Sequence, residues 1–298
     1  MEGVDGLIEI EVIMADISNY FRLDATLYPG SGLTFFVFDD SQKNSFINDC
    51  LLPFREAYIS ESKLTAIVND YQTKREDEIK AQLPDKGEVM SGDFGEILSF
   101  YLACQLWSPT VNVFPMKWRF KDKKKAPSHY TDIMLFELQD PSNPSAASIN
   151  DTMYSYEVKT RATKLGNQPY KTHVRKAFKT YKDGRPESTI LEAVFYANKD
   201  AVERAAETIP YLELRCKEEG YKELYHQVHR FSDAVTTTYR KEHNAVAIVD
   251  SDMLTEQMSR MPGDLIAQHP NVKNVYCLPI KELKALYEKV YDDMPLKA

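Results

Sequence analysis

Three charged residues in two apolar stretches have the types and spacing of a site that acts on phosphate. Asp132 opens residues 132–138, and Glu157 and Lys159 lie at the end of residues 153–159; both stretches have the length and composition of β-strands. Side chains alternate between the two faces of a strand, so Glu157 and Lys159 share a face. If the two strands pair as a hairpin, Asp132 and Glu157 lie close together.

Two carboxylates that lie close together need a positive charge beside them. At a separation of about 4 Å and an effective dielectric constant near 20, they repel by roughly 4 kcal/mol. Mg²⁺ binds a few carboxylates together with water and phosphate oxygens. The sequence therefore predicts a Mg²⁺ site, with Mn²⁺ as a substitute, formed by Asp132, Glu157 and the main-chain carbonyl of Val158. Lys159 is the predicted catalytic ammonium, placed to position a water molecule and to offset charge on a phosphate. The alternative is a surface ion pair between Glu157 and Lys159, worth about 0.2–1 kcal/mol.

A third carboxylate, Glu96, lies in residues 92–106, where apolar residues recur at helical spacing. Gly92 and Gly95 precede it, and small residues at these positions let a helix pack closely against a sheet. We therefore expect Glu96 to reach the strand edge as a further catalytic carboxylate and metal ligand.

The arrangement of these residues resembles the PD-(D/E)XK nuclease superfamily. The matching residues are Glu96 on the leading helix, Asp132 on the first strand, and Glu157, Val158 and Lys159 on the second. In that superfamily the acids bind Mg²⁺, and the lysine helps the attacking water to cleave a phosphodiester bond. The resemblance implies a restriction-endonuclease-like core, in which helices flank a mixed sheet. Thr131 departs from the pattern, because a proline often precedes the aspartate.

The wider chain resembles the HamA family, the nuclease subunit of Hachiman anti-phage defence. The resemblance depends on the helix with Gly92, Gly95 and Glu96, on the later aspartate and EVK motif, and on a basic helix that contains Lys176. It implies DNA as the substrate and an ATP-dependent helicase as the partner. The function expected from it is a metal-dependent DNA nuclease that serves as the effector of a helicase-coupled defence system.

Positive charge is concentrated around these motifs. Residues 117–185 contain fifteen Lys and Arg against seven Asp and Glu, so they carry +8, whereas the whole chain carries −8 and the remainder therefore −16. Within this segment, residues 173–181 predict a helix with a basic stripe. We expect the stripe to contact DNA phosphates, the alternative being a solvated face; its residues are Lys171, Arg175, Lys176 and Lys179.

Strands interspersed with helices predict an α/β or α+β fold. Residues 7–14 alternate as a half-buried strand, residues 33–38 form an apolar strand, and residues 48–83 have a helical pattern. The Pro-Asp-Lys-Gly sequence at residues 84–87 predicts a boundary. We expect a smaller N-terminal α+β domain, residues 1–85, as a partner and control surface, and a nuclease domain over residues 86–298.

Several protein classes are disfavoured. No run approaches about 20 apolar residues, so we expect no transmembrane helix and no membrane partner. Residues 1–16 lack the basic start of a secretory signal, and four widely spaced cysteines suit a reducing compartment, so we expect a cytoplasmic protein. Residues 166–172 lack the glycine pattern of a P-loop, so we expect no nucleotide cofactor.

Two alternatives to the DNA nuclease remain open. One is a catalytically silent DNA-binding or scaffold subunit that keeps the fold. The other is an RNase on the same fold, because the predicted site acts on a phosphodiester and does not sense the 2′-hydroxyl.

Overall fold

The computed structural model describes residues 16–120, 130–142, 148–163, 188–200, 204–232, 239–261, 263 and 265–298. The expected strand at residues 7–14 and the expected basic helix at residues 173–181 lie outside the described residues. The four predicted phosphate contacts, Lys171, Arg175, Lys176 and Lys179, lie outside them as well. Along the described chain, no helix combines the length and apolar character needed to cross a bilayer.

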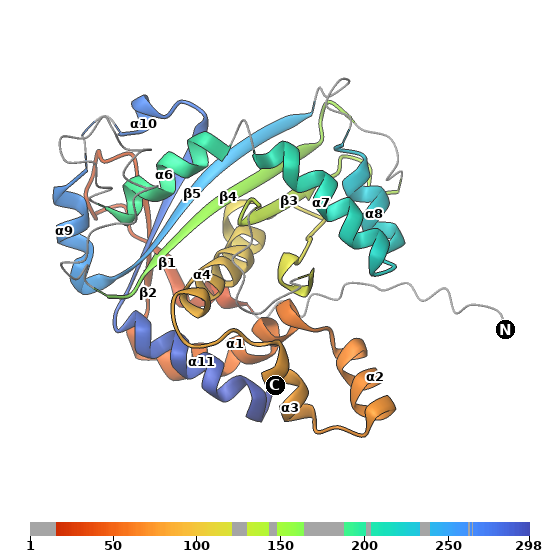
Figure 1. Cartoon of the computed structure of the whole chain (residues 1–298). Coiled ribbons are helices and arrows are strands. Elements are labelled where there is room, and N and C mark those ends of the chain that lie inside the picture. Colours follow the sequence, from red (N-terminus) through yellow and green to blue (C-terminus); the bar gives the residue numbers. More distant parts are fainter. Residues whose placement is uncertain are drawn as a thin grey trace, which may run out of the picture.

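A six-stranded mixed sheet forms the centre of the molecule, in the order β1-β2-β6-β5-β4-β3 (Figure 1). Its strands are β1 (Phe21–Leu23), β2 (Thr34–Phe38), β3 (Ile133–Glu137), β4 (Thr152–Arg161), β5 (Arg240–Asp250) and β6 (Val272–Ile280). The four inner strands run parallel to one another, and β1 and β3 pair antiparallel at the two ends. The predicted mixed sheet flanked by helices is therefore confirmed.

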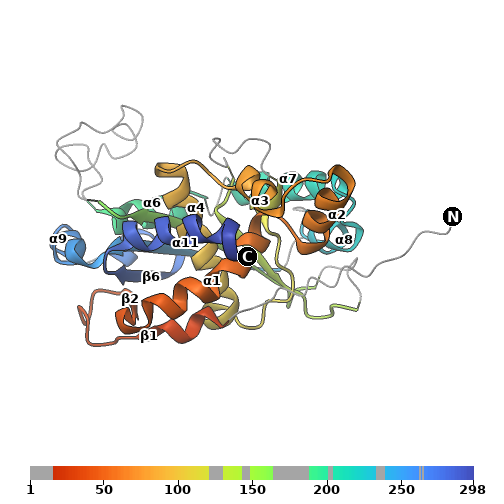
Figure 2. The same cartoon turned by 90° about the horizontal axis from the view of Figure 1, so that it is seen from below.

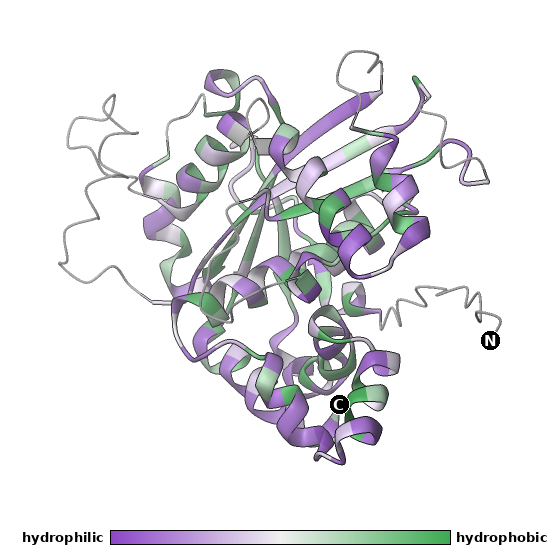
Figure 3. Ribbon diagram, turned by 45° about the vertical axis from the view of Figure 1, so that its right-hand side comes forward, coloured by the Kyte–Doolittle hydropathy of each residue, from purple (hydrophilic) through white to green (hydrophobic). Residues whose placement is uncertain are grey.

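Helices cover both faces of this sheet. They are α1 (Lys43–Tyr58), α2 (Glu61–Tyr71), α3 (Arg75–Gln82), α4 (Glu88–Leu102), α6 (Thr189–Asp200), α7 (Arg204–Glu218), α8 (Lys222–His229), α9 (Leu254–Ser259), α10 (Leu265–Gln268) and α11 (Leu283–Lys297). The largest core cluster joins α1, α4 and α11 to one face, while α6 packs on the other face beside a third cluster under α7 and α8. Figure 2 shows α1 and α11 side by side, and Figure 3 shows hydrophobic residues along the inner parts of the strands, with hydrophobic and hydrophilic residues mixed along the helices.

Strand β4 separates apolar from charged side chains by simple alternation. Tyr156 and Val158 are buried in the core cluster that contains α4. Glu157 and Lys159 point to the opposite face, where the Lys159 ammonium lies 5.2 Å from the centre of the Tyr196 ring of α6. The face that the alternation predicts for this pair is therefore the face that α6 covers.

Residues on both sides of the predicted boundary near residue 85 share one sheet and one core. Strand β2 pairs in parallel with β6, which is close to the end of the sequence. Helix α1 packs against α11 within the largest core cluster. The boundary therefore divides the sequence but does not divide the sheet, and the role of residues 1–85 as a partner surface stays a prediction.

A buried polar pair joins β4 to β5 two residues before Glu157. Ser155 and His243 are register partners, and a hydrogen bond of 2.6 Å joins the Ser155 hydroxyl to Nδ1 of His243. Burial, with a smaller effect from Lys241, lowers the pKa of His243 to about 4. The imidazole therefore stays neutral in the folded protein well below its usual pKa.

This shift predicts how acid affects stability. A histidine in the unfolded chain titrates near 6.5, so the unfolded state binds more protons than the folded state between about pH 6.5 and 4. The free energy of unfolding should therefore fall as the pH is lowered through this range. When urea unfolding is measured between pH 7 and 5, the free energy of unfolding should fall less steeply for His243→Gln than for wild type. Equal slopes for the two proteins would contradict the assignment to His243.

Candidate active site

Asp132 and Glu157 meet where β3 begins beside β4. The two strands are antiparallel, and Ile133 is opposite Tyr156, so Asp132 comes opposite Glu157. The main-chain N–H of Val158 donates a hydrogen bond of 2.8 Å to Oδ2 of Asp132. The predicted antiparallel pairing is confirmed, and it brings the two carboxylates to one end of the strand pair.

Lys159 contacts both of these carboxylates. Its ammonium forms an ion pair with Oε1 of Glu157 and lies 3.8 Å from Oδ2 of Asp132. Burial alone would lower the pKa of Lys159, but the charges of Glu157 and Asp132 outweigh burial and raise it. Lys159 is therefore a charged donor in this site and not a proton acceptor. A quarter of its side chain stays exposed, whereas Glu157 is almost completely buried.

Glu96 is on α4, which packs directly on the face of β4 opposite to Glu157 and Lys159, and it is linked to Asp132 through the ammonium of Lys117. A Cβ atom on Gly95 would lie 1.8 Å from Oγ1 of Thr160, so only glycine permits this approach. The prediction of close helix packing is confirmed at Gly95. It is wrong for Gly92, where a Cβ would meet nothing within 4 Å.

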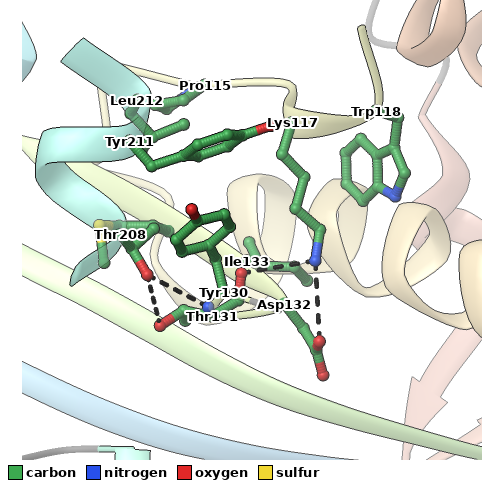
Figure 4. A pocket seen from close by; sticks show the side chains of 11 residues that line it. Pro115, Lys117, Trp118, Tyr130, Thr131, Asp132, Ile133, Thr208, Tyr211 and Leu212 are labelled. Atoms are coloured by element: carbon green, nitrogen blue, oxygen red, sulfur yellow. Dashed lines mark hydrogen bonds and ion pairs between the residues drawn. The ribbon is translucent and has the colours of Figure 1, made fainter. Parts of the chain in front are cut away.

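Lys117 joins the site, although the sequence did not indicate it. It belongs to a short 3₁₀ helix, Lys117–Phe120, and its ammonium lies 3.0 Å from Oε2 of Glu96 and 3.7 Å from Oδ1 of Asp132. It also donates to the carbonyl of Thr131 at 3.4 Å. Figure 4 shows its side chain extending past Trp118 toward Asp132. Burial by itself would lower the pKa of Lys117, but Glu96 and Asp132 outweigh it, so the pKa is raised.

One sequence signal could have identified Lys117. It lies between the apolar residues Met116 and Trp118, and a lysine among such neighbours is rarely buried without a carboxylate partner. By charge alone it is only the first cation of the basic segment, residues 117–185.

The segment that leads into Asp132 is held by α7. The N–H of Thr131 donates to the Thr208 hydroxyl at 3.2 Å, and that hydroxyl lies at the same distance from Oγ1 of Thr131 (Figure 4). The rings of Tyr130 and Tyr211 stack with their centres 4.1 Å apart. A small pocket beside Asp132 is lined by both tyrosines and by Lys117. These contacts fix the main chain at the position where Thr131 replaces the expected proline.

The charges of the site favour a divalent cation with hard oxygen ligands. Glu96, Asp132 and Glu157 contribute three negative charges, and Lys117 and Lys159 contribute two positive charges, which leaves −1. Among the described residues, no three His, Cys, Asp or Glu side chains form a group that could hold a metal ion. A cation would therefore combine carboxylates with main-chain, water or phosphate oxygens, as Mg²⁺ commonly does.

The oxygens available at the site suit such a cation. Asp132 and Glu157 supply carboxylates, and the Val158 carbonyl lies beside them, where it accepts a bond of 3.3 Å from Lys159. Glu96 bonds instead to Lys117 and to Nε1 of Trp118, the latter at 3.1 Å. The role of Glu96 as a metal ligand stays a prediction.

Comparison with known proteins identifies the family of the chain. No curated protein matches it. A family model described as HamA matches residues 19–294, nearly the whole chain. The resemblance expected from the glycine-rich helix and the EVK motif is thereby confirmed. The chain therefore belongs to the HamA family, whose members are subunits of Hachiman anti-phage defence.

Proposed function

We propose that this protein is a Mg²⁺-dependent deoxyribonuclease of the PD-(D/E)XK type and the effector subunit of its defence system. One observation carries the proposal: Asp132, Glu157 and Lys159, which lie up to 27 positions apart in the sequence, meet in one group across β3 and β4. A purely structural ion pair between neighbours on β4 would not require Asp132. It also would not require Glu157 to be buried almost completely.

Each residue has a proposed task. Asp132, Glu157 and the Val158 carbonyl would hold the cation, and Mn²⁺ could replace Mg²⁺. When bound, the cation would polarise a phosphate oxygen and offset the charge of the transition state. Lys159 keeps its proton, so it would orient the attacking water as a donor and stabilise negative charge on the phosphate. Glu96, held by Lys117 and Trp118, would complete the carboxylate group from the side of α4.

The substrate and the partner are proposed from the family and from the charge distribution. DNA would approach along the basic segment, with phosphate contacts from Lys171, Arg175, Lys176 and Lys179, which lie outside the described residues. The partner would be an ATP-dependent helicase, as the resemblance to the HamA family implies, and that partner would hydrolyse the ATP, since we find no P-loop in this sequence. Residues 1–85 would face that partner, and the complex would act in the cytoplasm.

A cleavage assay tests this function. The purified protein, alone and with the candidate helicase, is incubated with linear, circular and single-stranded DNA and with RNA, with and without Mg²⁺. Metal-dependent DNA cleavage is the expected result. Cleavage of RNA alone would identify the protein as an RNase. Binding of DNA without any cleavage, under all these conditions, would indicate a catalytically silent subunit.

A divalent cation should also raise the thermal stability of the protein through Asp132 and Glu157. A ligand that binds only the folded state, at a concentration one hundred times its Kd, raises the free energy of unfolding by about 2.7 kcal/mol. Asp132→Asn should remove most of this stabilisation, measured as the shift of Tm with added Mg²⁺ or Mn²⁺. An equal shift in wild type and variant would contradict a cation site at Asp132.

The contacts of Asp132 also indicate whether Asp132→Asn stabilises or destabilises the metal-free protein. Repulsion between carboxylates alone would make Asp132→Asn stabilising. Lys117 and Lys159 already supply the missing positive charge. The variant should therefore melt below wild type in EDTA, because it leaves the buried Lys117 and the partly exposed Lys159 with one carboxylate fewer.

A further inference from the structure

The proposed reaction uses Lys117 only to hold Glu96, yet its charge also acts on Asp132, one of the proposed cation ligands. Its ammonium lies between Glu96 of α4 and Asp132 at the start of β3. We propose that Lys117 is the built-in counter-ion of the cation site, which neutralises these carboxylates before a divalent cation binds and then opposes that binding. Lys117 would thus set the affinity of the site for divalent cations. This inference depends on the cation site proposed above.

Lys117 is held so that it cannot move away when a cation arrives. Only 8% of its side chain is exposed, against 25% for Lys159. The next residue, Trp118, donates to Glu96 and packs edge-on against Phe100, with ring centres 5.7 Å apart. Arg119 donates from Nε to the Glu56 carbonyl at 2.9 Å and pairs with the Glu56 carboxylate at 3.3 Å. The two residues that follow Lys117 are therefore anchored to α4 and to α1.

The two lysines consequently differ in what they can do. The partly exposed Lys159 can shift toward solvent or substrate when Glu157 takes a cation. The buried Lys117 must stay beside Asp132, so its charge and that of the cation act on each other at short range. In a protein interior, the repulsion of a single and a double positive charge a few ångströms apart exceeds the free energy of a tenfold change in affinity.

A titration with Mn²⁺ on the full chain, without nucleic acid, tests this role. Isothermal titration calorimetry compares wild type with Lys117→Met, which keeps the length and apolar stem but removes the charge, and with Lys117→Arg, which keeps the charge. We expect Lys117→Met to bind Mn²⁺ at least tenfold more tightly than wild type. Lys117→Arg should stay within about threefold of wild type.

The outcomes separate this inference from the proposed function. Wild type that binds Mn²⁺, together with Lys117→Met that binds it equally or more weakly, overturns the counter-ion role and leaves the cation site in place. Wild type that binds no Mn²⁺ overturns both.

A second comparison needs no metal and covers the case in which Lys117→Met folds poorly. The double variant Glu96→Gln/Lys117→Met removes one negative and one positive charge, so the site returns to a net charge of −1. Glutamine also keeps an oxygen for the Trp118 N–H. In EDTA, Lys117→Met should melt below wild type and the double variant should melt above Lys117→Met. If Lys117 served only to fill space, the second substitution would give no recovery, and that result would refute the inference.

Discussion

Lys159→Ala should reduce DNA cleavage by about 10²–10³-fold while the protein stays folded. Removing one charge that is fixed in place for the transition state typically has an effect of this size. Lys159 lies within ion-pair distance of both proposed metal-binding carboxylates, and its raised pKa keeps it charged at the working pH. The measurement is a single-turnover cleavage rate at saturating Mg²⁺, with circular dichroism and Tm as tests of folding.

Lys241 offers a matched control for this experiment. It is also a lysine on a central strand whose ammonium lies over a tyrosine ring, 5.1 Å from the centre of Tyr239. It is exposed and stands at the opposite end of β5 from the register partner of Lys159, Ala247. Lys241→Ala should therefore cleave at the wild-type rate. If Lys159→Ala cleaves as fast as Lys241→Ala, with contaminating nuclease excluded, Lys159 is not catalytic.

Gly95→Ala should destabilise the protein by about 3 kcal/mol or more, at the upper end of the usual cost of overpacking a core. The new methyl group would lie 1.8 Å from Oγ1 of Thr160 and 3.3 Å from Cδ1 of Ile248. Helix α4 would have to move away from β4, and Glu96 would move with it. Urea unfolding measures the loss, and the cleavage rate should fall even where the variant is folded.

Gly92 provides the control, because it is on the same helix and has open space around its Cα. Gly92→Ala should stabilise the protein by about 0.5–1 kcal/mol through helix propensity. Adding Thr160→Ala to Gly95→Ala removes the closest oxygen and should recover part of the lost stability. Equal stability of Gly95→Ala and Gly92→Ala would show that α4 does not depend on Gly95 for its contact with the sheet.

The part of the site that the sequence predicts correctly follows from local periodicity. Alternation along residues 153–159 puts Glu157 and Lys159 on one face, and helical spacing in residues 92–106 identifies the helix that carries Glu96. The strand expected at residues 33–38 corresponds to β2, Thr34–Phe38. The helical pattern of residues 48–83 corresponds to α1, α2 and α3. These features depend only on neighbours within a turn or a strand.

Lys117 and the sheet order could not be predicted in this way. Lys117 lies in a four-residue helix with no periodic pattern, and its partners, Glu96 and Asp132, are 21 and 15 positions away. Lysine is among the residue types that are rarely buried unless they are paired, so only the tertiary structure shows that Lys117 is buried. Likewise, nothing local in β2 indicates that it pairs with β6, more than 230 positions later. This long-range pairing is why a boundary near residue 85 does not separate the sheet.

The position of β6 between β2 and β5 has a consequence for the order of folding during synthesis. Residues 21–38 cannot join the rest of the sheet until residues 272–280 have left the ribosome, because β6 is their neighbour. Pairings between segments so far apart in the sequence form slowly, because the entropy cost of closing the loop comes before the stabilising contacts are made. In a nascent chain, β3 and β4 could therefore pair while β1 and β2 still lack their neighbour in the sheet. Assembly of the sheet is thus tied to the synthesis of residues 272–280, and a chain terminated before them would lack the strand that joins β2 to β5.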